Sequence, residues 1–182
     1  MEILLIIILV IILIVCGIAI FYASIYNKFQ DYIIRINEVE SIIDNNLRKK
    51  YDLINRAIPI IKSIIPKDKE IFEEIVKLRS RKLSNFELFR VLERSSSELN
   101  SLKEEFPDIQ KSEEIKKIQN NIIDIDNTVD EATSYYNDNI SIYNKLLKKF
   151  PSNIVATFSK YKEKLFFDRK DMSDDDYNDF KL

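Results

Sequence analysis

The longest regular pattern of apolar positions lies near the C-terminal end of the chain, in residues 118–150. The positions alternate in steps of four and three residues, and only Asn139 interrupts the apolar series. They are Ile118, Ile122, Ile125, Val129, Ala132, Tyr136, Asn139, Tyr143, Leu146 and Phe150. This spacing places the side chains on one face of an α-helix, and neither Gly nor Pro interrupts it. The pattern predicts one helix about 48 Å long, which needs long partner helices to cover its apolar seam.

A second apolar seam runs through the N-terminal half of the chain. Its members are Ile25, Phe29, Tyr32, Ile36, Val39, Ile43, Leu47, Tyr51, Ile54 and Ile58. The seam continues a wholly apolar stretch, and together they predict a single helix that extends about 40 residues, or about 60 Å, beyond that stretch. Pro59 is expected to kink this helix because proline lacks the backbone donor. The residues before Pro66 are expected to end it.

Shorter helical patterns lie between the two seams. One helix is predicted over residues 67–82, with an apolar stripe of Ile71, Phe72, Ile75 and Leu78. Ser84 and Glu87 have the spacing of a capping box, which predicts a new helix start. The stripe of that helix comprises Phe89, Leu92, Leu99, Leu102 and Phe106. Residues 106–108 predict a turn, and Ser112 is expected to cap the long final helix.

The N-terminal apolar run begins at Ile3 and ends at Ala23 without a charged residue. As a helix of about 21 residues it matches a hydrocarbon core of about 30 Å. A cleaved signal peptide would need a basic residue before the run, and a lipoprotein signal would need a small residue where Val15 precedes Cys16. A retained transmembrane helix fits best, with an aromatic belt of Phe21, Tyr22 and Tyr26. Because Lys28 and Arg35 follow the run and no Lys or Arg precedes it, the C-terminal body is predicted to be cytoplasmic.

These patterns divide the chain into three parts. Residues 1–24 form the membrane anchor, residues 25–167 form a domain of long helices, and residues 168–182 form an acidic tail that is predicted to be disordered. The apolar residues after Pro151 are expected to pack back on the bundle; they are Ile154, Val155, Ala156, Phe158, Leu165, Phe166 and Phe167.

Composition excludes most common enzyme templates. The chain has no His, its one Cys is Cys16, and its one Gly is Gly17, both inside the apolar run. Catalytic triads with His, zinc sites with His or clustered Cys, and glycine-rich phosphate loops are therefore excluded. The net charge of −2 gives no reason to expect a nucleic-acid partner. We expect no catalysis and no cofactor.

Two basic clusters lie at residues 48–50 and 79–82. An anionic-lipid site is one interpretation, but Arg48 lies about 37 Å along the helix beyond Ala23. Attraction to lipid fades over about 8–10 Å. A solvated face, or pairing with Asp44, with Asp52 or with acids of the last helix, is the favoured interpretation.

Several short segments form recognisable motifs. Residues 45–54 read N-N-L-R-K-K-Y-D-L-I, and residues 150–156 read F-P-S-N-I-V-A. These segments resemble motifs of the LemA family of bacterial membrane-anchored proteins, and residues 70–80 resemble its acidic-to-A-R-S segment. An acid–Asn pair and two Tyr-Asn pairs complete the resemblance, although Thr133 stands where the family usually has Arg. The candidate structural or interaction residues are Arg48, Tyr51, Asp52, Arg79, Asp126, Asn127, Tyr136, Asn137, Tyr143, Asn144 and Pro151.

The resemblance implies an all-α fold with one N-terminal transmembrane helix followed by an elongated, antiparallel, coiled-coil-like helical bundle. It also implies a single-pass protein of the bacterial inner membrane. Tyr136 and Tyr143 lie on the seam and are expected in the core, with Asn137 and Asn144 bonding across helices. A ligand-binding role for these residues is the alternative. Asn139 is expected to set the helix register.

The function that fits these features best is a membrane-anchored helical scaffold. Its partners would be the bilayer, through Ile3 to Ala23, and other proteins at the membrane, with a homo-oligomer also possible. The alternative is a membrane-associated regulator or sensor, linked to envelope stress or to a membrane protease, that binds a small ligand in the bundle. An enzyme that uses carboxylates is a third and remote class.

Overall fold

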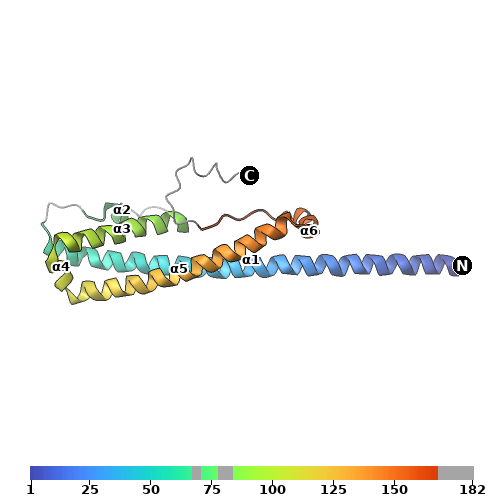
Figure 1. Cartoon of the computed structure of the whole chain (residues 1–182), viewed down its shortest axis with the longest axis horizontal. Coiled ribbons are helices and arrows are strands. Elements are labelled where there is room, and N and C mark those ends of the chain that lie inside the picture. Colours follow the sequence, from blue (N-terminus) through green and yellow to red (C-terminus); the bar gives the residue numbers. More distant parts are fainter. Residues whose placement is uncertain (67–70, 78–83, 168–182) are drawn as a thin grey trace. The chain divides into compact units, whose positions relative to one another are not determined.

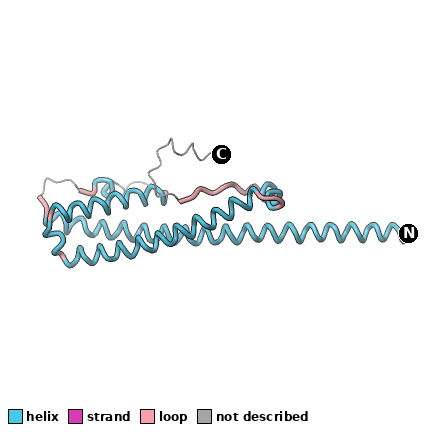
Figure 2. The backbone as a smooth tube through the Cα atoms, viewed as in Figure 1, coloured by secondary structure: helices cyan, strands magenta, loops and turns pink. Residues whose placement is uncertain are grey.

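The computed structural model describes residues 1–66, 71–77 and 84–167. The described chain is helical and contains no strand (Figures 1 and 2), so the all-α prediction is confirmed. The helices are α1 (Glu2–Ile64), α2 (Glu73–Lys77), α3 (Asn85–Glu105), α4 (Pro107–Lys111), α5 (Glu113–Lys148) and α6 (Ser152–Phe158). The predicted start of a helix near residue 67 and the acidic tail at 168–182 lie outside the described residues.

Helix α1 is a single helix of 63 residues, as the N-terminal seam predicted. It continues through Pro59 and ends at Ile64, where the following Pro66 was expected to stop it. The buried members of its stripe are Phe29, Ile36, Val39, Ile43, Leu47, Ile54 and Ile58, all of them predicted. Leu53, Ala57 and Ile61 widen this buried stripe.

The predicted capping box opens helix α3. The Glu87 backbone N–H donates to Ser84 Oγ at 3.3 Å, and the Ser84 backbone N–H donates to Glu87 Oε2 at 2.9 Å. The predicted turn at residues 106–108 is wrong in one respect, because Pro107 begins the short helix α4. Proline suits the first turn of a helix, where its fixed φ is helical and its missing N–H has no partner to lose.

Helix α5 carries the long C-terminal seam. The predicted positions that are buried are Ile118, Ile122, Val129, Tyr136, Asn139 and Tyr143, whereas Ile125, Ala132 and Leu146 are half-buried. Phe150 is 74% exposed, so its assignment to the seam is wrong. The reason is that α5 ends at Lys148 and the helical register does not extend to residue 150. The seam pattern also missed Thr133 and Ile140, which are buried between the predicted positions.

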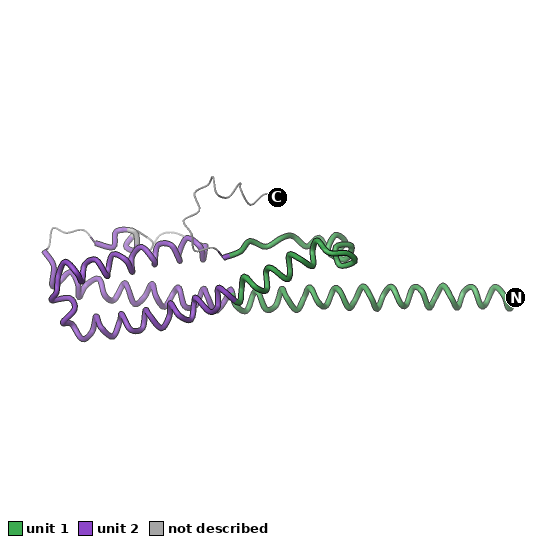
Figure 3. Tube along the Cα trace, viewed as in Figure 1, with its two compact units in different colours: residues 1–39, 135–166 green, residues 40–134, 167–182 purple. Residues whose placement is uncertain are grey.

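The chain divides into two compact units (Figure 3), and each of the two long helices contributes to both. Unit 1 comprises residues 1–39 and 135–166, and unit 2 comprises residues 40–134 and 167–182. Within unit 2, α3 and α5 run antiparallel on either side of the short α4 (Figure 1).

The two cores are built from different side chains. The core of unit 2 is mainly aliphatic and includes Ile43, Leu47, Ile54, Ile61, Ile75, Leu92, Leu99, Ile109, Ile115 and Ile122. The core of unit 1 is smaller and more aromatic, with Phe29, Ile36, Val39, Tyr136, Ile140, Tyr143, Val155 and Ala156.

The segment after α5 follows its prediction only in part. Val155 and Ala156 are buried in unit 1, whereas Ile154, Phe158, Leu165 and Phe166 are exposed. Helix α6 has only seven residues and buries one face, and residues 161–167 have no helical structure. In unit 2, Phe167 is buried and its ring centroid lies 4.6 Å from Phe86 and 5.5 Å from Phe89.

Candidate functional site

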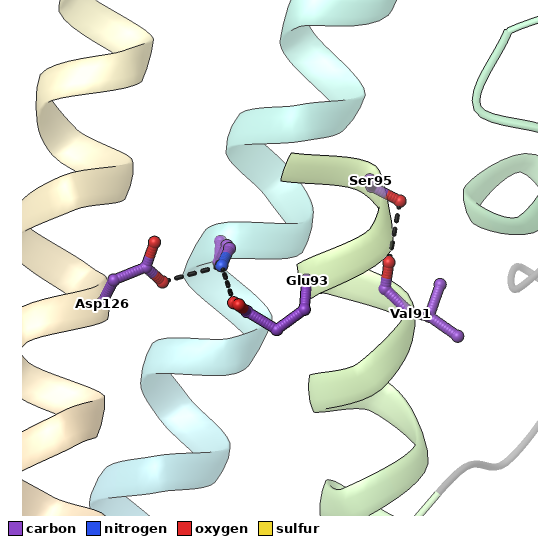
Figure 4. A network of polar contacts seen from close by, with 5 residues as sticks. Val91, Glu93, Ser95 and Asp126 are labelled. Carbon is purple, nitrogen blue, oxygen red and sulfur yellow. Dashed lines mark hydrogen bonds and ion pairs between the residues drawn. The ribbon is translucent and has the colours of Figure 1, made fainter. Parts of the chain in front are cut away.

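A buried lysine joins three helices of unit 2 (Figure 4). Lys50 Nζ donates to Glu93 Oε1 of α3 and to Asp126 Oδ1 of α5, each at 2.7 Å. The Lys50 side chain is only 1% exposed, whereas those of Glu93 and Asp126 are 50% and 37% exposed. We call these three residues the Lys50 cluster. The cluster places a cation among apolar residues and keeps both of its carboxylate partners in reach of water.

The position of Lys50 follows from the α1 stripe. Lys50 lies three residues after Leu47 and four before Ile54, both of which are buried, so it occupies the same helix face. A buried ammonium group is costly unless it is paired and hydrogen-bonded. Two charge-assisted hydrogen bonds meet that requirement here. The expected pairing of the basic cluster with an acid of the last helix is therefore present, at Lys50.

Burial raises the pKa of Asp126. This desolvation outweighs the hydrogen bond and the attraction from Lys50, which lower the pKa, and the neighbouring charges of Glu93 and Asp130 raise it further. Asp126 therefore takes up a proton at a higher pH in the folded protein than an exposed aspartate does. The cluster is therefore a structural ion network in which one acid, Asp126, is protonated at a higher pH than an ordinary aspartate.

An open groove of about 860 Å³ lies between α1 and α5 in unit 2. Its lining combines both charge signs with two amides and two apolar side chains: Lys49, Asp52, Leu53, Asn55, Arg56, Asn121, Asp124 and Ile125. Such a lining suits a polar ligand or the polar face of a partner helix. The described ranges contain no group of three or more Cys, Asp or Glu side chains placed to hold a metal ion.

The second Tyr-Asn pair lies in unit 1 and joins three segments. Tyr143 is buried, its ring meets Phe29 edge-on at 5.7 Å between centroids, and burial raises the pKa of its hydroxyl. The side chain of Asn144 donates to the Lys164 carbonyl at 2.8 Å and accepts from the Lys164 N–H at 3.1 Å. Asn144 thus satisfies the backbone of a chain segment that has no secondary structure of its own.

The comparisons with known proteins bear on these motif residues. The chain matches the LemA family over residues 39–178. This chain belongs to the LemA family. The matched range contains the Lys50 cluster, the groove and both Tyr-Asn pairs. Among curated proteins, no sequence matches the chain.

The LemA motif residues of α1 do not converge on one point. Arg48 is exposed and pairs with Asp44, with 2.9 Å between Nε and Oδ2, as expected. Tyr51 is half-buried, and Asp52 is exposed and lines the groove. Arg79 lies outside the described residues.

The motif residues of α5 and beyond also have separate environments. Asn127 is exposed next to Asp126, Tyr136 is buried, and Asn137 is half-buried. Pro151 is half-buried and directly precedes α6. The side chain of the neighbouring Asn139 donates to the Tyr135 carbonyl of its own helix at 2.7 Å, so this bond does not join two helices.

The sequence analysis placed Lys50 in the basic cluster at residues 48–50 and expected that cluster to pair with acids, but it did not identify Lys50 as buried, and it missed Glu93. The signal for Lys50 was present, because a lysine at a seam position between Leu47 and Ile54 predicts a buried cation that needs partners. No comparable signal exists for Glu93, which is half-exposed on α3. Only its distance from Lys50 in the structure identifies it as a partner.

Proposed function

We propose that this LemA-family chain is a single-pass, membrane-anchored helical interaction protein without catalytic activity. The observation that carries the proposal is that α1 combines two roles. This one helix contains the candidate membrane span and also supplies buried side chains to both units, such as Phe29 to unit 1 and Ile54 to unit 2. Because the same helix forms the anchor and part of the core, the helical domain would be held close to the membrane.

The anchor itself is supported by exposure and length. Helix α1 is the one helix, among the described residues, that is long and apolar enough to cross a membrane. Its apolar side chains near the N-terminus, from Ile3 to Ile20, are exposed in the protein and would face lipid. In water, the exposure of these apolar side chains would cost free energy for each of them.

The finer part of the proposal is location and orientation. The basic residues that flank the span, Lys28 and Arg35, favour a cytoplasmic body, and family membership favours the inner membrane of a bacterium. The body would then display its polar helix faces, the groove included, to membrane or cytosolic proteins.

Cysteine labelling tests the orientation. Cys16 is the only cysteine, so Cys16→Ala gives a background for a single reporter at the exposed position Asn127→Cys. A membrane-impermeant thiol reagent should label this reporter only after the membrane is opened. Labelling in intact spheroplasts would show that the body faces outward and would overturn the orientation.

Site-specific crosslinking in native membranes tests the interaction role. A photoreactive residue at Asn121 or Arg56 in the groove should give defined protein adducts, whereas the same residue at exposed Lys116 on α5 is the matched control. A body that yields no adduct at any exposed position would contradict the interaction role.

A second candidate is a regulator or sensor that binds a small ligand. The groove favours it, because two basic, two acidic and two amide side chains line one concave surface. Such a ligand should raise the melting temperature of the full chain, and Asp52→Ala or Arg56→Ala should abolish the shift without lowering the basal melting temperature. A groove that gives protein adducts and no ligand-dependent shift favours the interaction role.

A further inference from the structure

An exposed apolar surface closes one end of unit 1. Phe150 and Phe158 are 74% and 76% exposed, and Ile154 is 47% exposed. Ile154 and Phe158 are four residues apart on α6 and therefore share one face of it. The other face of α6, with Val155 and Ala156, is buried. This short helix therefore has an apolar face that packs on the protein and a second apolar face that does not.

Side-chain contacts hold this end of unit 1 against a defined stretch of α1. The Tyr22 hydroxyl lies 3.2 Å from Ser159 Oγ, and Gln30 Nε2 donates to the Tyr161 hydroxyl at 2.7 Å. The Tyr161 ring also lies 6.3 Å from Tyr26 and 5.0 Å from Phe29. The exposed surface thus lies beside residues 22–30 of α1, directly after the apolar run that ends at Ala23.

Figure 3 shows the same relation within unit 1. The segment that contains α6 lies at the point beyond which α1 continues alone toward the N-terminus. If the apolar run of α1 crosses a bilayer, Tyr22 and Tyr26 lie at the level of the lipid headgroups. Residues that contact these tyrosines lie at the same level.

The charge of this end of unit 1 differs from that of the whole chain. Residues 145–166 contain six lysines and a single acidic residue, Glu163, whereas the full chain has a net charge of −2. Glu163 is paired with Lys148, with 2.7 Å between Oε1 and Nζ. Lys149 and Lys160 flank the exposed apolar side chains in sequence and are exposed themselves.

We propose that the α6 surface, defined as Phe150, Ile154, Phe158, Lys149 and Lys160, is a membrane-contact site for anionic lipids of the bilayer that α1 spans. The aromatic and aliphatic side chains enter the headgroup region, and the lysines bind lipid phosphates. Exposed apolar residues beside basic ones are the composition of interfacial contact sites. The inference rests on the proposed anchor and adds a second contact with the same membrane.

Depth-dependent quenching on the full chain tests this site. In the Cys16→Ala background, Phe158→Cys and Ile154→Cys are each labelled with a fluorophore and reconstituted in vesicles of phosphatidylcholine and phosphatidylglycerol. Nitroxide-bearing lipids should quench both probes. Asp138→Cys, exposed on α5 in the same unit, is the matched control that should stay bright.

The native Cys16 separates the failure of this inference from the failure of the anchor. A probe on Cys16 in the wild-type chain reports on the apolar run directly. Quenching at Cys16 without quenching at Phe158 and Ile154 would overturn the α6 site and leave the anchor intact. An unquenched Cys16 would overturn the anchor, and the α6 site with it.

The lysines provide a second test. With Phe158→Cys as the reporter, Lys149→Gln with Lys160→Gln should lower the quenching toward the level of the Asp138 control, because each basic residue strengthens binding to anionic lipid about fivefold. The matched pair Lys116→Gln and Lys117→Gln, on the exposed face of α5 in unit 2, should leave the quenching unchanged. Two results together would overturn the role of anionic lipid. The first is that the Phe158 probe is quenched equally in pure phosphatidylcholine and in vesicles that contain phosphatidylglycerol. The second is that the two pairs of lysine substitutions give the same quenching.

Discussion

Units 1 and 2 share two helices but solve the problem of buried polar groups in different ways. In unit 2 a buried polar group carries a charge: it is the amine of Lys50, and carboxylates from two other helices bind it. In unit 1 the main polar link across segments is neutral, because the amide of Asn144 bonds both backbone groups of Lys164. The comparison shows that one helix, α5, carries charged polar links in unit 2 and a neutral one in unit 1.

The difference follows from which backbone groups in each unit need hydrogen-bond partners. Unit 2 is built mainly of helices, whose backbone groups bond within the helix. Outside its helices, the backbone N–H of Phe72 donates to Glu98 Oε1 at 2.8 Å. Unit 1 includes a segment, residues 161–166, without helix or strand, whose backbone groups need external partners. An amide that both donates and accepts is suited to that task, whereas a carboxylate or an ammonium group supplies only one of the two functions.

The largest expected effect tests the aromatic core of unit 1. Tyr143→Ala removes a buried ring that contacts Phe29, and such truncations cost about 3–5 kcal/mol of unfolding free energy. Tyr136→Ala, also buried on the α5 seam, should have a comparable effect. Thermal unfolding of the full chain in detergent, followed by circular dichroism, measures both. Lys148→Ala, on an exposed side chain, should change the free energy by no more than about 0.5 kcal/mol. Equal and small effects of all three substitutions would contradict the register.

The next effect tests the ion chemistry of unit 2. Glu93→Ala and Asp126→Ala together deprive the buried Lys50 amine of both carboxylates, and we expect a loss of about 3 kcal/mol. Each single substitution leaves one carboxylate in place and should cost less than half as much, so the double effect exceeds the sum. Chemical denaturation of the four proteins gives the coupling.

A third substitution sharpens this test. Lys50→Met in the double variant should restore most of the lost stability, because an apolar side chain of similar length needs no carboxylate. Additive single effects, together with no gain from Lys50→Met, would show that the cluster lies in a solvated environment.

A smaller effect tests the neutral link in unit 1. Asn144→Ala removes two hydrogen bonds and leaves the N–H and carbonyl of Lys164 without them, which should cost about 1–2 kcal/mol. Asn127→Ala is the matched control, since Asn127 is also a motif asparagine on α5 but is exposed. Its effect should stay within about 0.5 kcal/mol. Melting curves that shift equally for both variants would contradict the role of Asn144.

The smallest effect concerns pH. Because the pKa of Asp126 is raised in the folded protein, the folded state binds more protons than the unfolded state between the ordinary pKa of 3.8 and the raised value. The contribution of Asp126 to stability is therefore fully present below the unfolded pKa and decreases as the pH rises through the folded pKa. The stability of the wild type relative to Asp126→Asn should increase as the pH falls from 7 toward 4. A difference that shrinks on acidification would show that pairing with Lys50 outweighs burial.

Much of the fold was predictable from local patterns. The α1 stripe, the Ser84–Glu87 capping box and the end of α1 before Pro66 all follow from helical periodicity, capping and proline chemistry. The errors lie where a helix ends or begins. Phe150 was assigned to a helix that had already ended, and Pro107 was assigned to a turn although it opens α4. Boundaries are hard to predict because the few residues there can satisfy more than one local structure.

The candidate sites were less predictable because they join distant segments. Asp126 and Asn144 were singled out as motif residues and Lys50 as part of a basic cluster, but neither the pairing of Lys50 with Asp126 and Glu93 nor that of Asn144 with Lys164 was specified. Lys50 lies 43 and 76 residues from Glu93 and Asp126, and Asn144 lies 20 residues from Lys164. A pairwise contact over such a separation leaves no periodic signal in one sequence.

The sequence by itself determined the helical class, the apolar span at the start of α1 and the buried faces of α1 and α5. These are local properties, since a repeat near 3.6 residues defines a helix face wherever the helix lies. Tertiary structure decided that Lys50 is enclosed by two carboxylates, that Asn144 binds the backbone of Lys164, and that α6 lies beside Tyr22. Each of these depends on which segments meet, and the meeting is set by the packing of side chains around a shared core rather than by the pattern of any one helix.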